Sequence, residues 1–199
     1  MTESPAPKTA LSSRLVLVAL FAVFFLPIFL AWALNVELSR WLPFGRTNHG
    51  QLIQPAQRFD ASTLTRVDGA PIDETLLSGK WTLVYIEPSA CMAECDRAAY
   101  RMRQSRYAMG KDMERVQRLV VSPRPFAKDA AGKLLAYDPS LTVVAAGPEW
   151  IQGPRPAKGQ AEIYLVDPQG YLVMWYRADA DPTGLIKDLK RLLKISKIG

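Results

Sequence analysis

Apolar and polar positions along this chain predict one membrane-length helix followed by an α/β domain. Residues 15–34, LVLVALFAVFFLPIFLAWAL, contain no charged side chain. As a helix they would rise about 30 Å, which matches the hydrocarbon core of a bilayer. The run is longer than the apolar region of a signal peptide, and no Ala-x-Ala cleavage pattern follows it. We therefore predict an uncleaved transmembrane helix rather than a signal peptide or a buried soluble helix.

The orientation of this helix follows from the lengths of its flanks more than from their charge. Basic residues lie on both sides of the run, at Lys8, Arg14, Arg40 and Arg46, so the positive-inside bias is weak. A short tail before a large domain favours residues 1–14 in the cytoplasm and the domain outside, in the periplasm of a bacterium. Residues 35–58 would be a juxtamembrane linker, and residues 59–199 a periplasmic domain.

Beyond the linker, apolar runs alternate with helical spacings. A short hairpin is predicted around Asp68-Gly69, and a second hairpin around the turn Asp167-Pro168-Gln169-Gly170. The other expected strands cover residues 81–87, 116–121 and 141–145, and the expected helices residues 92–109, 126–136 and 182 onward. The order of these elements predicts a thioredoxin-like α/β fold, in which helices flank a central mixed sheet.

The only two cysteines of the chain, Cys91 and Cys95, follow the first of these strands. Cys91 opens the expected helix and Cys95 lies four residues later, so both sulfurs fall on one helix face. The helix N-terminus favours a thiolate at Cys91, and Arg97 and Arg101 act in the same direction while Glu94 and Asp96 oppose it. Cys91 is the expected attacking sulfur because it is nearer the exposed turn, and Cys95 is the expected resolving sulfur. The same pair could instead bind a soft metal ion such as Cu(I), because the spacing of the two cysteines fits both a reversible disulfide and a two-thiolate copper site.

The two cysteines also have structural interpretations, and other chemistries compete with a redox or copper role. A structural disulfide between residues four apart would remove little chain entropy, and two buried inert thiols are the other alternative. Zinc needs about four protein ligands, or three and a water, and two cysteines with one distant histidine, His49, do not supply them within the domain. No Cys-x-x-Cys-His string exists for haem attachment, and no Ser/His/Asp constellation is credible. His49 is interpreted as a linker residue, with a role as a third metal ligand as the alternative.

The net charge of +6 is spread along the chain. Basic residues alternate with apolar ones near the C-terminus, at Lys187, Lys190, Arg191, Lys194 and Lys197. We interpret them as a solvated helix face rather than a nucleic-acid site. Attraction to anionic lipid headgroups or to an acidic partner is a secondary reading.

Three segments resemble the Sco/SenC family of membrane-anchored, thioredoxin-fold copper proteins that help to mature cytochrome c oxidase. They are GKWTLVYIEPSACMAEC (Gly79 to Cys95), LLAYDPSLTVVAAG (Leu134 to Gly147) and EIYLVDPQGYLV (Glu162 to Val173). The resemblance implies that Cys91 and Cys95 are paired copper-binding or redox thiols. It also implies copper as a cofactor, and an oxidase subunit or another assembly factor as the partner.

The chain departs from the family at two places. Family members carry a histidine about eight residues before the Asp-Pro-x-Gly turn, but Gly159 stands there and residues 96–199 contain no histidine. The prolines that usually flank the family's cysteines are replaced by Met92 and Asp96. The proline that ordinary thioredoxins place before the facing strand is also missing near Ala161, since Pro156 comes several residues too early.

These observations leave three functional hypotheses. The first is an accessory protein for assembly of a haem-copper oxidase, acting by thiol–disulfide exchange or Cu(I) handling, with the missing histidine favouring exchange. The second is a general membrane-tethered periplasmic thiol–disulfide oxidoreductase. The third is a non-catalytic scaffold that binds through surface residues such as Trp150 or Arg155.

Overall fold

The chain forms two compact units, Met1–Thr47 and Asn48–Gly199. The computed structural model describes residues 13–41, 48–62, 64–67, 69, 72, 74–87, 93–122, 126, 128–146, 162–196 and 198. In the first unit, α1 (Ser13–Trp41) is the one described helix that is long and apolar enough to cross a membrane, judged by length and composition alone. Its candidate span, Arg14–Leu34, contains the segment that the sequence predicts as a transmembrane helix.

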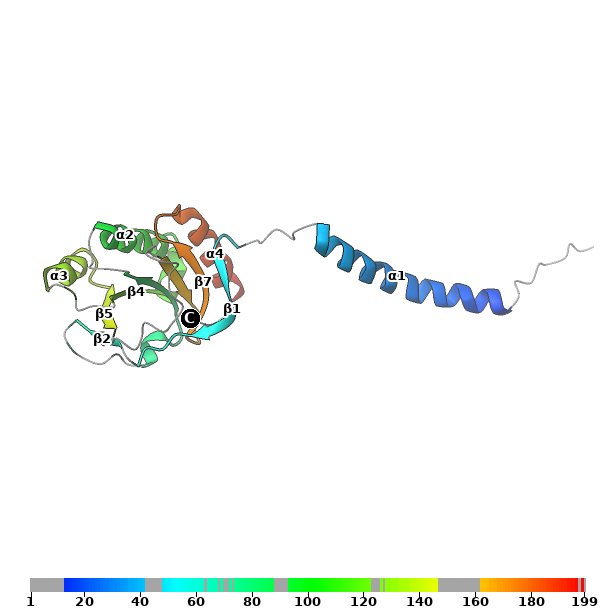
Figure 1. The fold of residues 1–199 in the computed structure, drawn as a ribbon, viewed down its shortest axis with the longest axis horizontal. Helices are drawn as coiled ribbons and strands as arrows, with labels where there is room; N and C mark the ends of the chain where they lie inside the picture. Colours follow the sequence, from blue (N-terminus) through cyan, green and yellow to red (C-terminus); the bar gives the residue numbers. More distant parts are fainter. Residues whose placement is uncertain are drawn as a thin grey trace, which may run out of the picture. The chain divides into compact units, whose positions relative to one another are not determined.

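The second unit is built on a sheet whose seven strands lie in the order β1-β7-β6-β3-β4-β5-β2 (Figure 1). The strands are β1 (Gln51–Arg58), β2 (Leu64–Arg66), β3 (Trp81–Ile86), β4 (Val116–Ser122), β5 (Thr142–Ala146), β6 (Glu162–Val166) and β7 (Tyr171–Arg177). β3 pairs in parallel with β4 and antiparallel with β6. This mixed sheet confirms the predicted thioredoxin-like α/β fold, and its central strand is the apolar run that directly precedes the cysteines.

Helices α2 (Ala93–Tyr107), α3 (Lys128–Tyr137) and α4 (Pro182–Ile195) pack on one face of the sheet. The inward positions of α2 are Cys95, Ala98, Ala99 and Met102, which recur at helical spacing and are almost fully buried. The opposite face is covered by side chains that precede β3 and lie partly in the short helix η1 (Glu74–Leu77): Phe59, Ala61, Leu64, Ile72, Leu76 and Leu77. β3 is therefore buried on both faces, which explains why its sequence is continuously apolar.

The hairpin expected around Asp68-Gly69 is not found in the described residues. β2, which precedes that turn, pairs with β5, and the next described element is η1 rather than a returning strand. Asp68 itself lies outside the described residues. β1 pairs with β7 at one edge of the sheet, and β2 pairs with β5 at the other. The two segments therefore lie at opposite edges, although they are close in sequence. Both are edge strands whose side chains are largely exposed, so neither has the apolar alternation that would reveal its partner.

The folded unit also begins earlier than the sequence suggested. Residues 48–58 were expected to end the linker, but Asn48 opens the second unit and β1 begins at Gln51. The segment QLIQPAQR contains a proline, and four of its eight residues are polar. It is tolerated as a strand because it lies at the sheet edge.

Candidate functional site

Cys95 lies in the first turn of α2, where the sequence placed it, and its side chain is fully buried. It is disulfide-bonded. The sequence has one other cysteine, Cys91, which lies outside the described residues, as do Met92, Pro156, Gly159, Ala161, Trp150 and Arg155. The catalytic and metal-binding roles assigned to Cys91 and Cys95 remain predictions.

A buried tyrosine–glutamate pair lies where β3 ends. The Tyr85 hydroxyl donates a hydrogen bond to Glu87 Oε2 at 3.0 Å, and the Glu87 backbone N–H donates to the Val121 carbonyl at 2.9 Å. Glu87 is only 2% exposed. Burial, with the charge and hydrogen bond of Glu87, raises the pKa of Tyr85 well above its usual value, so this tyrosine stays neutral.

The same pair lies next to the start of α2. The charges of Glu94 and Arg97, both in the first turns of that helix, act on the pKa of Tyr85 in opposite directions. Tyr85 and Cys95 also belong to the same packed cluster on the helix-covered face. The carboxylate of Glu87 is thus the buried acid that ends the strand leading to the cysteines.

In the sequence, Glu87 is recognisable only as the last residue of an expected strand. A carboxylate that ends a continuously apolar strand just before paired cysteines is the signal that could have identified it. Burial of such a group requires a hydrogen-bond partner, and the tyrosine two residues earlier, on the same face of the strand, is the candidate that the period of two provides.

A matching pair lies on the opposite face of the sheet. Glu162 pairs with Ile86 across β6 and β3, so its side chain points away from the α2 face. It is 2% exposed and accepts a hydrogen bond from the Tyr164 hydroxyl at 2.6 Å. Burial raises the pKa of Tyr164, and so do the hydrogen bond to Glu162 and the charge of Glu162. The two pairs are alike in chemistry, but only the Glu87 pair shares a face with Cys95.

His49 is not a free linker residue. Its backbone N–H donates to Asp188 Oδ2 at 2.7 Å, and its ring Nδ1 lies 3.1 Å from Asp188 Oδ1. Gly50 N–H and the Tyr176 hydroxyl donate to the same Oδ2, at 2.9 and 3.0 Å. His49 therefore ties the start of the second unit to α4, and the linker interpretation is corrected.

The described residues do not assemble a copper site. β7 and β6 separate β1, which follows His49, from β3, and three strand spacings amount to about 14 Å. The Nδ1 atom of His49 is already hydrogen-bonded to Asp188 Oδ1. Among the described residues no group of three histidine, cysteine or carboxylate side chains could hold a metal. Cu(I) favours soft sulfur ligands, and the one cysteine sulfur in this part of the chain is already in a disulfide.

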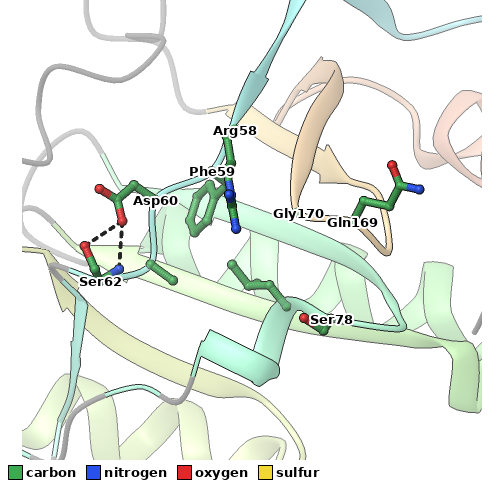
Figure 2. A pocket seen from close by; sticks show the side chains of 9 residues that line it. Arg58, Phe59, Asp60, Ser62, Ser78, Gln169 and Gly170 are labelled. Atoms are coloured by element: carbon green, nitrogen blue, oxygen red, sulfur yellow. Dashed lines mark hydrogen bonds between the residues drawn. The ribbon is translucent and has the colours of Figure 1, made fainter.

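A separate pocket of about 530 Å³ lies at the other end of the sheet (Figure 2). It is lined by Arg58, Phe59, Asp60, Ala61, Ser62, Leu77, Ser78, Gln169 and Gly170. The turn that contains Gln169 follows β6 beside the start of β3, because Val166 pairs with Thr82. Asp60 is engaged by the N–H and hydroxyl of Ser62, which lower its pKa. The pocket thus lies about the length of β3, roughly 17 Å, from the cysteine end.

The comparisons with known proteins agree with this fold. A family model described as "Transmembrane-like, thioredoxin-like, C-terminal domain" matches residues 81–196, more than half of the chain. No curated protein sequence matches.

Sco proteins are among the solved structures that resemble the chain. The Bradyrhizobium japonicum ScoI structure with copper bound is 24% identical, with a TM-score of 0.50 over 68% of this chain and 99% of that chain. Yeast Sco1 is 17% identical, with a TM-score of 0.59 over 72% and 98%. BsSco, a member of the Sco family of cytochrome c oxidase assembly proteins in which a disulfide switch was identified, is 15% identical, with a TM-score of 0.53 over 73% and 99%. At these identities the likeness shows a shared fold, as the sequence resemblance predicts.

Proposed function

Because the chain belongs to the family of transmembrane-like, thioredoxin-like C-terminal domains, we propose that it is a membrane-anchored thiol–disulfide exchange protein of oxidase assembly. The observation that carries the proposal is Cys95, disulfide-bonded at the start of the helix that follows the central strand. Reactive groups of open α/β sheets collect at the carboxyl ends of the strands. The Sco-like fold and the apolar helix α1 support an assembly role at a membrane, with the domain in the periplasm.

The proposed reaction reduces a disulfide of a partner protein. The Cys91 thiolate attacks one partner sulfur, and the partner's other sulfur leaves as a thiolate and takes up a proton. The Cys95 thiolate then attacks Cys91 in the mixed disulfide, which releases the second partner thiol and leaves the Cys91–Cys95 disulfide. Two electrons have passed to the partner, and a dithiol reductant must return them for the next turnover. Burial of Cys95 suits a resolving sulfur that no outside disulfide reaches first.

Glu87 is proposed to receive the proton that Cys95 must lose before it can attack Cys91. Replacing Glu87 with glutamine keeps its size and an acceptor oxygen for Tyr85, but removes the carboxylate. We expect the rate of exchange with a small disulfide substrate to fall about a hundredfold, at the low end of general acid–base catalysis. The measurement is the reduction rate of that substrate by the reduced full-length protein in detergent micelles.

The matched control is Glu162→Gln, which alters the equivalent tyrosine–glutamate pair on the face away from Cys95. It should leave the rate unchanged. Equal slowing in both variants would mean that loss of a buried carboxylate disturbs the sheet, and no slowing in Glu87→Gln would remove the proposed proton acceptor.

The function itself is tested with Cys91→Ser/Cys95→Ser in the full-length chain. We expect the host to lose haem-copper oxidase activity, and the single variant Cys95→Ser to trap a mixed disulfide with the partner, detected on non-reducing gels. Normal oxidase activity with the double variant would refute the assembly role. If that strain instead accumulates other oxidised proteins and the purified chain reduces insulin, the general oxidoreductase is supported. A complex that forms without either cysteine supports the scaffold.

Cu(I) handling is the second candidate, supported by the copper-bound Sco structures of similar fold. Titration of the reduced chain with Cu(I), with X-ray absorption to count sulfur and nitrogen ligands, tests it directly. Stoichiometric binding that disappears in Cys91→Ser/Cys95→Ser would favour copper transfer, whereas absence of tight binding would leave exchange as the function.

A further inference from the structure

The outer face of α4 carries a stripe of positive charge. Lys187, Lys190, Arg191 and Lys194 recur at i, i+3, i+4 and i+7, so they share one face of the helix, and all four are exposed. The opposite face, with Leu185, Asp188, Leu189 and Leu193, is buried in the domain. We call the four exposed residues the α4 basic stripe.

The stripe differs from four arginines elsewhere in the domain. Arg106, Arg115, Arg118 and Arg177 each pair with a carboxylate. Within the described part of the chain, none of the four stripe residues forms an ion pair, and α4 carries no carboxylate besides the buried Asp188. At the end of the stripe, Ile195 is 70% exposed. A cationic face with an exposed aliphatic side chain beside it is complementary to an anionic lipid surface.

The position of α4 near the start of the second unit also favours contact between the α4 basic stripe and an anionic lipid surface. The buried side of the helix holds His49 and Gly50 through Asp188, so α4 packs where the chain enters the domain. Residues 42–47 alone separate the end of α1 at Trp41 from Asn48. Seven fully extended peptide steps reach at most about 25 Å. A domain on so short a tether meets its own membrane at high effective concentration.

We propose that the α4 basic stripe binds anionic phospholipid headgroups of the membrane that anchors the chain. The proposal rests on the membrane anchoring proposed above. Each basic side chain close to an anionic surface favours docking by about fivefold. The four basic side chains of the α4 basic stripe are therefore sufficient to hold a tethered domain against the membrane surface. An acidic protein or a nucleic acid is the alternative ligand for the same stripe.

The test is amine footprinting of the full-length chain in nanodiscs of phosphatidylcholine, with or without phosphatidylglycerol. An acylating reagent labels exposed lysines, and mass spectrometry reads each site. We expect labelling of Lys187, Lys190 and Lys194 to fall at least fivefold when phosphatidylglycerol is present. Labelling of Lys80, Lys111 and Lys133, which are exposed but lie off α4, should not change. Protection should disappear at about 1 M salt, where charges are screened beyond roughly 3 Å.

The variant Lys190→Gln/Arg191→Gln leaves Lys187 and Lys194 as reporters and should lower the docked-to-free ratio by about 25-fold. The matched control Lys111→Gln/Lys133→Gln removes two exposed charges elsewhere and should preserve protection. Equal labelling with and without phosphatidylglycerol would overturn the proposal, as would protection that appears only after acidic protein or nucleic acid is added. A chain that does not stay with the discs would refute the anchor, which separates that failure from failure of docking.

Discussion

Replacing Asp138 with alanine is expected to destabilise the domain by about 3–5 kcal/mol, the usual effect of leaving one member of a buried ion pair alone. Its partner, Arg118, lies in β4 with 2% of its side chain exposed, and the Asp138 side chain is 5% exposed. The guanidinium donates to both carboxylate oxygens and to Ser140 Oγ at 2.6 Å. Without the carboxylate, a buried cation would keep one neutral partner.

Urea denaturation of wild type and variant measures this effect. The matched control is Asp179→Ala, which breaks the exposed pair with Arg177 and should give no measurable change, since exposed pairs contribute little. The double variant Arg118→Met/Asp138→Ala should recover most of the lost stability, because it removes the orphaned charge. If Asp138→Ala unfolds at the same urea concentration as Asp179→Ala, the pair has no structural role.

The elements near the centre of the sheet are predictable from sequence, and those at its edges are not. β3 is apolar at every position except Thr82, and all six of its residues are buried. β4 is buried at six of its seven positions and contains the apolar run Leu119–Val121. The β6–β7 hairpin has a clear turn. β1 and β2 lie at the edges with mostly exposed side chains. The partner of β1 is β7, more than a hundred residues away, and local periodicity carries no information about such a pairing.

The residues of the candidate site likewise divide into those predictable from local sequence and those that depend on long-range contacts. The position of Cys95 at the start of a helix follows from a strand, a turn and a helical spacing that are adjacent in sequence. The bonds of His49 to Asp188 depend on residues 139 apart, so the histidine is read as linker until the fold is known. Glu87 is intermediate, because its partner Tyr85 is local but its burial depends on α2 and β4.

Replacing Asp188 with alanine is expected to cost about 3–4 kcal/mol of unfolding free energy, since several donors lose a charged acceptor. Gly50 is buried and Tyr176 is 8% exposed, so neither donor is readily rehydrated. A Cβ at Gly50 would lie 2.4 Å from the Tyr176 ring, which shows how closely this segment packs. Tyr176→Phe removes one of the donors and should cost about 1 kcal/mol. Equal effects of the two variants would mean that the carboxylate acts only through the tyrosine.

The pH dependence of this prediction has a definite sign. Burial raises the pKa of Asp188, but the hydrogen bonds from Gly50, His49 and Tyr176 outweigh it, so the folded pKa lies below the ordinary 3.8. A depressed carboxyl pKa stabilises the fold above the unfolded pKa, and this contribution is lost as the pH falls through the folded value. The stability difference between wild type and Asp188→Asn should therefore be constant at neutral pH and shrink only below about pH 4. A difference that grows on acidification would mean that the charged carboxylate does not hold residues 49 and 50 against α4.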